Sequence, residues 1–313
     1  MARARVIVFG YGPLALASLA TLERLGGPPA AVVVPGNRTG PDVDLVRAHV
    51  QSRGWTLLVQ PPRTSLTPFL DTVRGLQPDL LLVCSYSMLL PPALIALARL
   101  GAVNVHGGLL PEYRGGHVMN WAIANGERET GVTLAYLDEG IDTGPVIAER
   151  RFPIAPDDDA ASVRGKLEDA GQALLREWWP AIEAGTAPRV PQDESRARYH
   201  RMRTADDGRI DWSASSAAIV NLVRALTAPW PGAFFVLGGR KIVVRRSLAV
   251  DAGAAAAAPG TIVRGDEAGL LVASGSGSVQ LLAMEIDGQP ARWPELEQAG
   301  LIPGVRLATT VTR

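Results

Sequence analysis

The sequence predicts an α/β protein: a Rossmann-like doubly wound parallel sheet followed by a small C-terminal β-barrel (OB-like) domain. Three observations predict this class. Over about the first 155 residues, short apolar runs rich in β-branched side chains alternate with segments of helical periodicity. After residue 129 the strand-like runs become longer and half-polar. Beyond residue 207, short strand-like runs follow one another at close, turn-punctuated spacing, which is typical of small barrels.

Five short apolar runs in the N-terminal half are expected to form buried parallel strands, because each is short and rich in Val, Ile and Leu. These runs are residues 6–9, 31–34, 56–59, 80–85 and 102–105. Between them, apolar residues recur at helical spacing in residues 14–25, 43–52, 66–76 and 92–100. Ligands of such sheets bind beyond the carboxyl ends of the strands, so a site is expected in the residues that follow each strand.

The second half of the chain has a different pattern. Residues 131–137 and 145–154 are expected to form longer, half-exposed strands, and residues 161–184 a helix. A polar stretch rich in Pro, Arg and Asp predicts a linker at 189–206, between a site-bearing domain at 1–188 and the β-barrel domain at 207–313. The barrel is expected to contain a helix at 217–226 and strands at 233–237, 241–245, 261–263, 269–273 and 278–285. The alanine-rich run 252–258 is expected to be a flexible loop.

Composition and charge narrow the class of protein. The 313 residues are 47% hydrophobic and 20% charged, as in ordinary globular proteins. The 31 basic and 31 acidic residues cancel, so no global positive field attracts nucleic acid, although a local patch could still act. Cys84 is the single cysteine and is expected to be a buried, inert thiol in a reducing compartment. No run approaches the roughly 18 apolar residues of a membrane helix, so a soluble cytoplasmic protein without a membrane partner is expected.

One familiar motif follows the first expected strand. Gly10-Tyr-Gly12-Pro-Leu-Ala15 matches the dinucleotide-binding pattern G-x-G-x-x-A. That pattern also requires an acidic residue about 20 positions further on, at the end of the second strand, to bind the ribose. Here the second strand ends in Val34-Pro-Gly-Asn37, without a carboxylate. We therefore interpret the glycines as a tight turn and Pro13 as the start of a helix, with nicotinamide-nucleotide binding as the weaker alternative.

A polar pair stands at the end of the fifth expected strand. Asn104 and His106 are two residues apart, so their side chains point to the same side of that strand. They also lie where this kind of fold binds ligands. A single histidine is more often a hydrogen-bonded structural residue, but an amide donor beside a titratable imidazole makes the catalytic and structural interpretations equally favoured.

A second polar feature, Asp138-Glu-Gly-Ile-Asp142-Thr-Gly144, is a glycine-bracketed turn between two expected strands. Such a turn can carry a carboxylate to the rim of a cleft. Taken alone, it is more simply interpreted as a polar hairpin turn. The four histidines and the one cysteine show no metal-ligand spacing, so no metal site is expected.

Together these residues resemble the motifs of the folate-dependent formyltransferase family. Besides the acidic turn, the family's elements occur in order and at matching spacing as Asn104-Val-His106-Gly-Gly-Leu-Leu-Pro111-Glu-Tyr-Arg114-Gly and Glu129-Thr-Gly-Val-Thr133. Arg209-Ile-Asp-Trp212 and Pro229-Trp-Pro-Gly232 resemble the family's C-terminal β-barrel domain, so the resemblance covers nearly the whole chain. One position departs from the pattern: Gly108 stands where the family usually has serine, which puts in doubt any contact made by that hydroxyl.

The resemblance implies an enzyme that moves a formyl group from its co-substrate, 10-formyltetrahydrofolate, to a primary amine. It implies that Asn104, His106 and Asp142 are catalytic, and their chemistry suits the reaction. An amide such as that of Asn104 can hydrogen-bond the oxyanion of the tetrahedral intermediate, and one such donor is typically worth about 10²–10³ in rate. An imidazole can carry protons between the attacking amine and the leaving nitrogen. Asp142 is expected to orient the imidazole or to accept the amine proton through water.

The resemblance also implies that the folate lies across the strand ends. One side of its pteridine pocket is expected to be the loop after the fourth strand, and the other side the acidic turn. The expected folate-binding residues are Ser87, Met88, Leu89, Leu90, Asp138 and Gly140. Arg114 and Asn120 are expected to bind the acceptor substrate. Without the resemblance, residues 88–90 would be assigned to simple core packing.

The family's acceptors divide between methionyl-tRNA and small amines, chiefly amino-sugar nucleotides. Its tRNA enzymes carry a basic insertion after the second strand, whereas Pro35-Gly-Asn-Arg-Thr-Gly-Pro41 is short and holds one arginine. Residues 120–121, 207–212 and 229–234 resemble the formyltransferase domain of the bifunctional polymyxin-resistance enzyme, which acts on a UDP-4-amino-sugar. We therefore favour an amino-sugar nucleotide or another small amine as partner over tRNA. A hydrolase of the same folate is a further alternative, and a homodimer is left open.

Overall fold

The computed structural model of the chain describes residues 3–250 and 257–308. Most of the alanine-rich run 252–258, expected to be a flexible loop, lies outside the described residues. The chain divides into two compact units, each built from three segments. The first unit comprises the segment that ends at Val118, the segment Glu129–Pro153 and the segment Arg164–His200. The second unit comprises Met119–Arg128, Ile154–Val163 and the segment that begins at Arg201. The boundary at residue 200 lies within the expected linker, 189–206, while the domain limits of 1–188 and 207–313 stay predictions.

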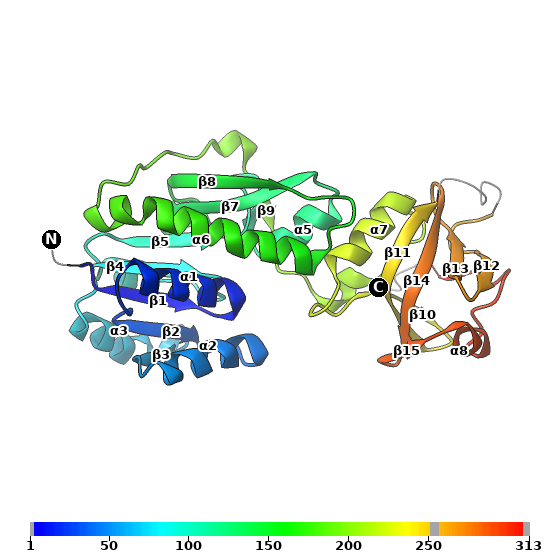
Figure 1. Cartoon of the computed structure of the whole chain (residues 1–313), viewed down its shortest axis with the longest axis horizontal. Helices are drawn as coiled ribbons and strands as arrows, with labels where there is room; N and C mark the ends of the chain where they lie inside the picture. The colour runs from blue at the N-terminus through cyan, green and yellow to red at the C-terminus, as the bar shows by residue number, and fades with distance from the viewer. Residues whose placement is uncertain (1–2, 251–256, 309–313) are drawn as a thin grey trace. The chain divides into compact units, whose positions relative to one another are not determined.

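A seven-stranded sheet forms the centre of the first unit (Figure 1). Its strands are β1 (Val6–Gly10), β2 (Ala31–Pro35), β3 (Leu57–Gln60), β4 (Leu80–Cys84), β5 (Ala102–His106), β7 (Glu129–Tyr136) and β8 (Val146–Pro153). They lie in the order β3-β2-β1-β4-β5-β7-β8. The first five are parallel, whereas β7 is antiparallel to β5, and β8 to β7. The predicted doubly wound α/β class is confirmed, with a mixed rather than wholly parallel sheet.

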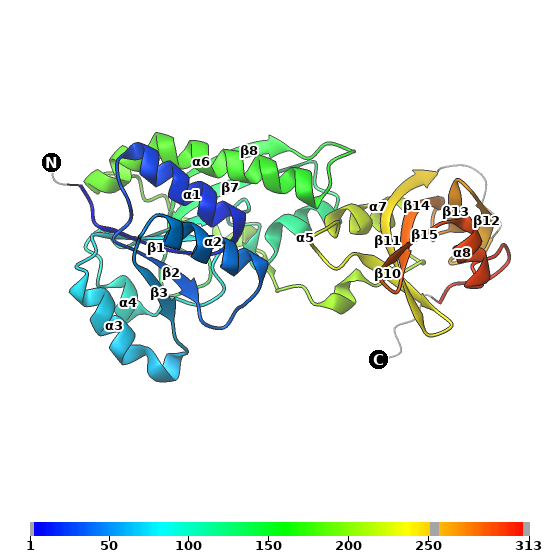
Figure 2. The same ribbon diagram turned by 60° about the horizontal axis from the view of Figure 1, so that its bottom comes forward.

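Helices cover both faces of this sheet (Figure 2). They are α1 (Gly12–Leu25), α2 (Pro41–Ser52), α3 (Leu66–Gly75), α4 (Pro92–Ile95) and α6 (Ala160–Ala184). On one face, a Cβ on Gly171 of α6 would contact both Leu14 of α1 and Val105 of β5. On the other face, α3 and α4 pack in a buried apolar cluster that includes Ala102 of β5. Within residues 3–250 and 257–308, no helix is long and apolar enough to cross a membrane.

The glycine-rich turn after β1 is tight, as interpreted from the sequence, but the helix begins one residue before Pro13. α1 begins at Gly12, and Pro13 is its second residue, where a missing backbone N–H costs no hydrogen bond. A Cβ on Gly10 would lie 2.7 Å from both Ala15 Cβ and Cys84 O, so the helix and the neighbouring strand leave room only for glycine. Cys84 is buried, and burial raises the pKa of its thiol to about 12, as expected of an inert core cysteine.

Some short elements differ from the prediction. The helix expected at 92–100 ends at Ile95, because the following residues form tighter i→i+3 bonds, from Leu97 N–H to Leu94 O and from Ala98 N–H to Ile95 O (both 3.2 Å). The sequence did not predict the elements β6 (Arg114–Gly115), α5 (Val118–Ala124), β9 (Tyr199–His200), β15 (Gln289–Ala291) and α8 (Trp293–Gln298). Elements of two to seven residues are too short to show a readable periodicity.

The second unit is built on an antiparallel sheet. Its strands are β10 (Ala233–Leu237), β11 (Arg240–Val250), β12 (Ile262–Asp266), β13 (Gly269–Ala273) and β14 (Ser278–Ile286), with β15 paired to β14. They lie in the order β10-β11-β14-β13-β12. Trp212 is fully buried in this unit and meets Phe235 edge-on, with ring centroids 5.6 Å apart. A helix, α7 (Ser216–Ala225), is capped by Ser215 Oγ, which accepts from Ala218 N–H. The predicted small C-terminal β domain is confirmed as this antiparallel sheet.

Candidate active site

β5 carries two of the three side chains that the sequence singled out, Asn104 and His106. Both share a sheet face with Ala102, since side chains two apart on a strand point the same way. Ala102 is buried in the apolar cluster beneath α3 and α4, whereas Asn104 is half-exposed and His106 is 6% exposed. The strand therefore leaves the apolar core at Ala102 and presents polar groups beyond it, toward the carboxyl ends of the parallel strands.

The third side chain, Asp142, reaches the same place by another route. Because β7 is antiparallel to β5, the turn after β7 begins beside the amino end of β5, where Leu137 N–H donates to Ala102 O (2.9 Å). The turn then folds back, and Asp142 takes a left-handed backbone conformation (φ +56°) that Asp tolerates better than most residues. Gly115 N–H donates to Asp142 Oδ2 (2.8 Å) and so fixes the carboxylate.

The structure brings the three predicted side chains together. Asn104 Nδ2 donates to Asp142 Oδ1 (3.4 Å), and His106 Nδ1 lies 3.6 Å from the same oxygen. His106 Nε2 lies 2.6 Å from Tyr113 O. A carbonyl oxygen only accepts hydrogen bonds, so Nε2 carries the hydrogen, and Nδ1 is the ring atom that faces the carboxylate.

This group of side chains has the chemistry for attack on a carbonyl carbon. An amide can donate to a developing oxyanion, while an imidazole beside a carboxylate can take up and return a proton. The side chains of His106 and Asp142 are only 7% and 12% exposed, so little water weakens the interactions between them. In the described part of the chain, no cluster of three or more His, Cys, Asp or Glu side chains could hold a metal ion.

Within the acidic turn, Asp138 is directed at its own backbone. Its Oδ1 accepts from Gly140 N–H (3.0 Å) and from the Thr143 hydroxyl (2.5 Å). Such bonds make a compact Asx-type turn. Ile141, between these contacts, is 50% exposed. The turn therefore presents an apolar side chain to solvent while Asp142 points inward.

The loop after β4, residues 85–91, contains the other predicted folate contacts. The Ser87 hydroxyl donates to Asn37 Oδ1 (3.0 Å), and Gln60 Nε2 donates to Leu89 O (3.2 Å), so residues after β2 and at the end of β3 hold the loop. Leu89 is 58% exposed, and its two neighbours are half-buried. Gln60 is 3% exposed, and its Oε1 accepts no hydrogen bond from the described residues.

The two residues expected to bind the acceptor, Arg114 and Asn120, are both buried. Arg114 is 0% exposed, and its guanidinium donates to Gln192 Oε1 and to the Glu194 carboxylate. Asn120 is 2% exposed, and its Nδ2 donates to Ala225 O (2.7 Å). Neither side chain presents a free surface to a substrate in this structure, and their assignment to the acceptor stays a prediction.

Two further residues support the site and were not singled out from the sequence. The Thr133 hydroxyl, on β7, donates to Gly108 O (2.8 Å) and accepts from Leu110 N–H (3.2 Å), which fixes the loop that follows His106. Thr133 ends one of the quoted motifs, so a signal for it existed. Gln192, whose Nε2 donates to Asp142 O (2.9 Å), lies in the expected linker, where no local pattern marks it.

Gly108 departs from the serine expected by resemblance, and its surroundings are tight. A Cβ at this position would lie 2.9 Å from Val118 Cγ2 and 3.2 Å from both His106 Nε2 and Tyr113 Cβ. A serine would therefore press on the imidazole edge that bonds to Tyr113 O. Glycine leaves that hydrogen bond undisturbed.

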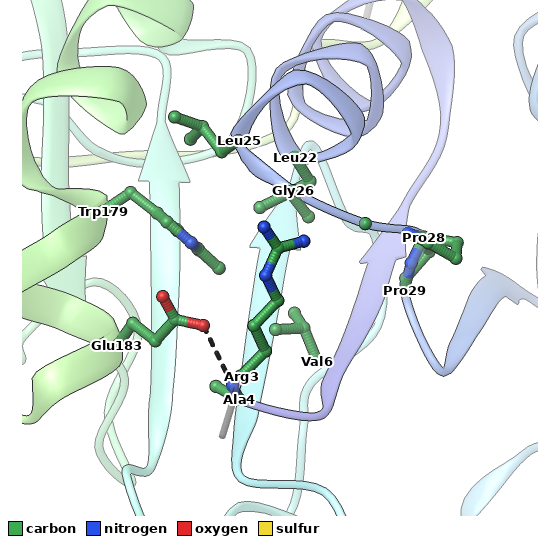
Figure 3. Close-up of a pocket in the computed structure, with 11 residues that line it drawn as sticks. Arg3, Ala4, Val6, Leu22, Leu25, Gly26, Pro28, Pro29, Trp179 and Glu183 are labelled. Atoms are coloured by element: carbon green, nitrogen blue, oxygen red, sulfur yellow. Dashed lines mark hydrogen bonds between the residues drawn. The ribbon is translucent and has the colours of Figure 1, made fainter. Parts of the chain in front are cut away.

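A separate pocket lies at the amino end of β1, whereas the three site side chains lie toward the carboxyl ends of the parallel strands (Figure 3). Val6, at the amino end of β1, and Trp179 of α6 line it, and Glu183 Oε1 accepts from Ala4 N–H there (2.9 Å). β1 and β5 are both parallel to β4, so the amino end of β1 lies at the edge away from His106. None of the three site side chains lines this pocket.

Comparison with known proteins gives matches to two family models. Residues 22–178 match the model described as formyl transferase, and residues 203–295 match the model described as formyl transferase, C-terminal domain. A methionyl-tRNA formyltransferase of Myxococcus xanthus is 38% identical over 312 residues, which cover 98% of this chain and 97% of that protein. The protein of the same name from Geobacter sulfurreducens is 36% identical and covers 98% of each chain.

Two solved structures share the fold of this chain. An N-formyltransferase from Helicobacter canadensis, in complex with folinic acid and dTDP-3-aminofucose, superposes with a TM-score of 0.70 at 18% identity, over 89% of this chain and 99% of that one. WlaRD, a sugar 3N-formyl transferase, gives a TM-score of 0.69 at 18% identity, over 90% and 98% of the two chains. At this identity the similarity concerns the fold alone.

Proposed function

The chain belongs to the formyl transferase family, and from that premise we propose that it transfers the formyl group of 10-formyltetrahydrofolate to the amino group of methionyl-tRNA. One observation carries the choice of acceptor. Seven relatives, 33–38% identical to this chain and matched over 76–99% of their own length, all bear the name methionyl-tRNA formyltransferase.

The prediction of an amino-sugar nucleotide as the favoured acceptor is therefore wrong. The prediction that tRNA is the less favoured partner is also wrong. The neutral charge misled because net charge is a sum over the chain: 31 basic and 31 acidic residues can cancel and still leave a local basic surface. The short segment 36–40 led to the wrong acceptor because it is a single loop, whereas the sequence identity to these relatives extends over most of the chain.

Asn104 is the proposed donor to the oxyanion. When the amine attacks the formyl carbon, negative charge develops on the formyl oxygen. The Asn104 amide carries two hydrogens, and Asp142 Oδ1 accepts one of them at 3.4 Å, so the other can be donated to that oxygen. One preorganised donor of this kind contributes about 10²–10³ in rate.

His106 and Asp142 are the proposed proton carriers. The attacking amine must lose a proton, and the leaving nitrogen must gain one. His106 Nδ1 and Asp142 Oδ1 lie 3.6 Å apart, and the bond from Nε2 to Tyr113 O fixes the orientation of the ring. A positioned acid–base pair of this type contributes about 10²–10⁴ in rate.

The residues near these strand ends fit a folate donor. The exposed apolar side chains of Leu89 and Ile141 suit contact with flat aromatic rings, and the buried Gln60 Oε1 can accept a hydrogen bond from a bound molecule. Folate supplies the formyl group, and the chain's own residues bind and orient it. The expected contacts Ser87, Met88, Leu90, Asp138 and Gly140 stay predictions. Since charged tRNA is used in translation, we place the protein in the cytoplasm.

An acceptor panel tests the proposal. The protein is incubated with 10-formyltetrahydrofolate and methionyl-tRNA, a UDP-linked amino sugar, or no acceptor, and release of tetrahydrofolate is followed. We expect release only with methionyl-tRNA. Release with the amino sugar alone would contradict the proposed acceptor, and equally fast release without any acceptor would indicate a hydrolase.

A further inference from the structure

Gln192 holds the backbone of the turn that carries Asp142. Its Nε2 donates to Asp142 O (2.9 Å) and to Gly144 O (2.7 Å), so both amide hydrogens bond the chain on either side of residue 143. The left-handed conformation of Asp142 (φ +56°) persists only where the surrounding structure holds it. The two bonds from Gln192 provide that hold.

Arg114 determines which way the Gln192 amide faces. Arg114 Nε and Nη2 donate to Gln192 Oε1 (3.1 and 2.9 Å). A guanidinium has donors only, so the amide oxygen must face it, and the amide NH₂ must face the turn. The remaining guanidinium hydrogens go to the Glu194 carboxylate (2.6 and 2.9 Å) and to the Tyr199 hydroxyl oxygen (3.0 Å), and Arg114 is 0% exposed. The arginine is thus fixed in place.

The same segment also holds the carboxylate of Asp142. Gly115 follows Arg114 directly, and its N–H donates to Asp142 Oδ2 (2.8 Å). β6 is in turn fixed by its pairing with β9, in which Arg114 N–H donates to Arg198 O (3.0 Å). One short pairing therefore places both the guanidinium that orients Gln192 and the N–H that binds the carboxylate.

We propose that Gln192 and Arg114 are positioning residues that hold the Asp142 carboxylate against His106 and Asn104, an inference that rests on the proposed function of those three side chains. Arg114 then acts through Asp142 rather than on the acceptor. The expected effect is large, because misplacing a catalytic group by about 1 Å can cost about a hundredfold in rate.

An isosteric variant tests this inference in the full-length protein. Gln192→Glu keeps an acceptor for Arg114 but places a carboxylate oxygen opposite the carbonyls of Asp142 and Gly144. We expect kcat to fall about 10- to 100-fold, with KM for both substrates within about threefold. Gln51→Glu makes the same chemical change on the exposed side of α2 and should retain the wild-type kcat. A wild-type kcat in Gln192→Glu would overturn the inference.

A double-mutant cycle separates positioning from a general loss of structure. If Gln192 acts through Asp142, then Gln192→Glu should cost less than about threefold when Asp142 is already asparagine. Losses that multiply in the double variant would contradict the inference, because they would mean that Gln192 supports the reaction independently of Asp142.

A spectroscopic readout keeps the inference distinct from the choice of acceptor. The ¹⁵N signals of the His106 ring, assigned with His106→Asn, report on the carboxylate beside the ring whether or not methionyl-tRNA is the substrate. We expect these signals to shift in Gln192→Glu, as in Asp142→Asn, and not in Gln51→Glu. Unchanged signals in Gln192→Glu would overturn the inference, whereas a wild-type protein inactive on methionyl-tRNA would overturn only the proposed function.

Discussion

Replacing Asp142 with asparagine removes one charge and leaves the shape of the side chain unchanged. Asp142 Oδ1 accepts from Asn104 Nδ2 (3.4 Å), and Oδ2 accepts from Gly115 N–H (2.8 Å). An asparagine offers one oxygen and one NH₂ group. If the NH₂ group takes the place of Oδ1, it faces the Asn104 NH₂ group. If it takes the place of Oδ2, it faces the Gly115 N–H. Either orientation sets one donor against another donor.

The effect on rate should exceed the effect on folding. Loss of a positioned acid–base partner costs about 10²–10⁴ in rate, or about 2.7–5.4 kcal/mol of activation free energy. Asn adopts the left-handed backbone of residue 142 as readily as Asp, and it keeps one of the two hydrogen bonds. A hydrogen bond to a charged group contributes about 1.5–3 kcal/mol, so Asp142→Asn should unfold at a lower temperature but stay folded at 25 °C.

Steady-state formylation of methionyl-tRNA measures this effect, with a thermal melt of the same samples. Asp157→Asn serves as the control, because it removes one carboxylate charge at an exposed position in the second unit. We expect wild-type kcat in the control and at least a hundredfold loss in Asp142→Asn. A folded Asp142→Asn protein with kcat within threefold of the wild type would refute the role assigned to the carboxylate.

Three further outcomes are expected. Asn104→Ala should lower kcat about 10²–10³-fold in the same assay, and a smaller loss would place the oxyanion donor elsewhere. The hydrogen bond from Arg201, with that from Thr204, lowers the pKa of Asp207 in the folded protein. This carboxylate therefore stabilises the fold at pH values above its unfolded pKa of about 3.9, and the stabilisation is lost as the pH falls below that value. Urea midpoints of wild type and Asp207→Asn should accordingly differ at pH 7 and converge toward pH 2. Cys84, with its raised pKa, should resist iodoacetamide at pH 8 until the protein is unfolded, and rapid labelling of the native protein would contradict its burial.

Much of the first unit could be predicted because burial on both faces of a sheet leaves continuous apolar runs. β1, β2 and β4 agree with their expected runs to within one residue. The pairing of β6 with β9 could not be predicted, because two-residue strands form only when residues about 85 positions apart meet. The length of α4 depends on the path of the chain between α4 and β5, and the composition of residues 92–100 does not reveal that path.

The site was predictable where it is local in sequence. Asn104 and His106 share a face by strand alternation alone, whereas Asp142 comes from a turn that starts at the other end of β5 and folds back. The family motifs, not any local physics, connected it to the pair. Gln192 meets Asp142 from 50 positions away in a segment that resembled a linker, so no local signal marked it. The proposed acceptor, methionyl-tRNA, is large, and net charge does not report how such a substrate would be bound.

The most direct test of the central claim follows the formyl group itself. Single-turnover reactions contain 10-formyltetrahydrofolate labelled in the formyl carbon, methionyl-tRNA and an excess of either wild type or His106→Ala. The account predicts that the label appears on the methionine amino group of the tRNA with wild type, and at least a hundred times more slowly with His106→Ala. Label recovered as free formate, or formylated tRNA produced equally fast by both proteins, would contradict it.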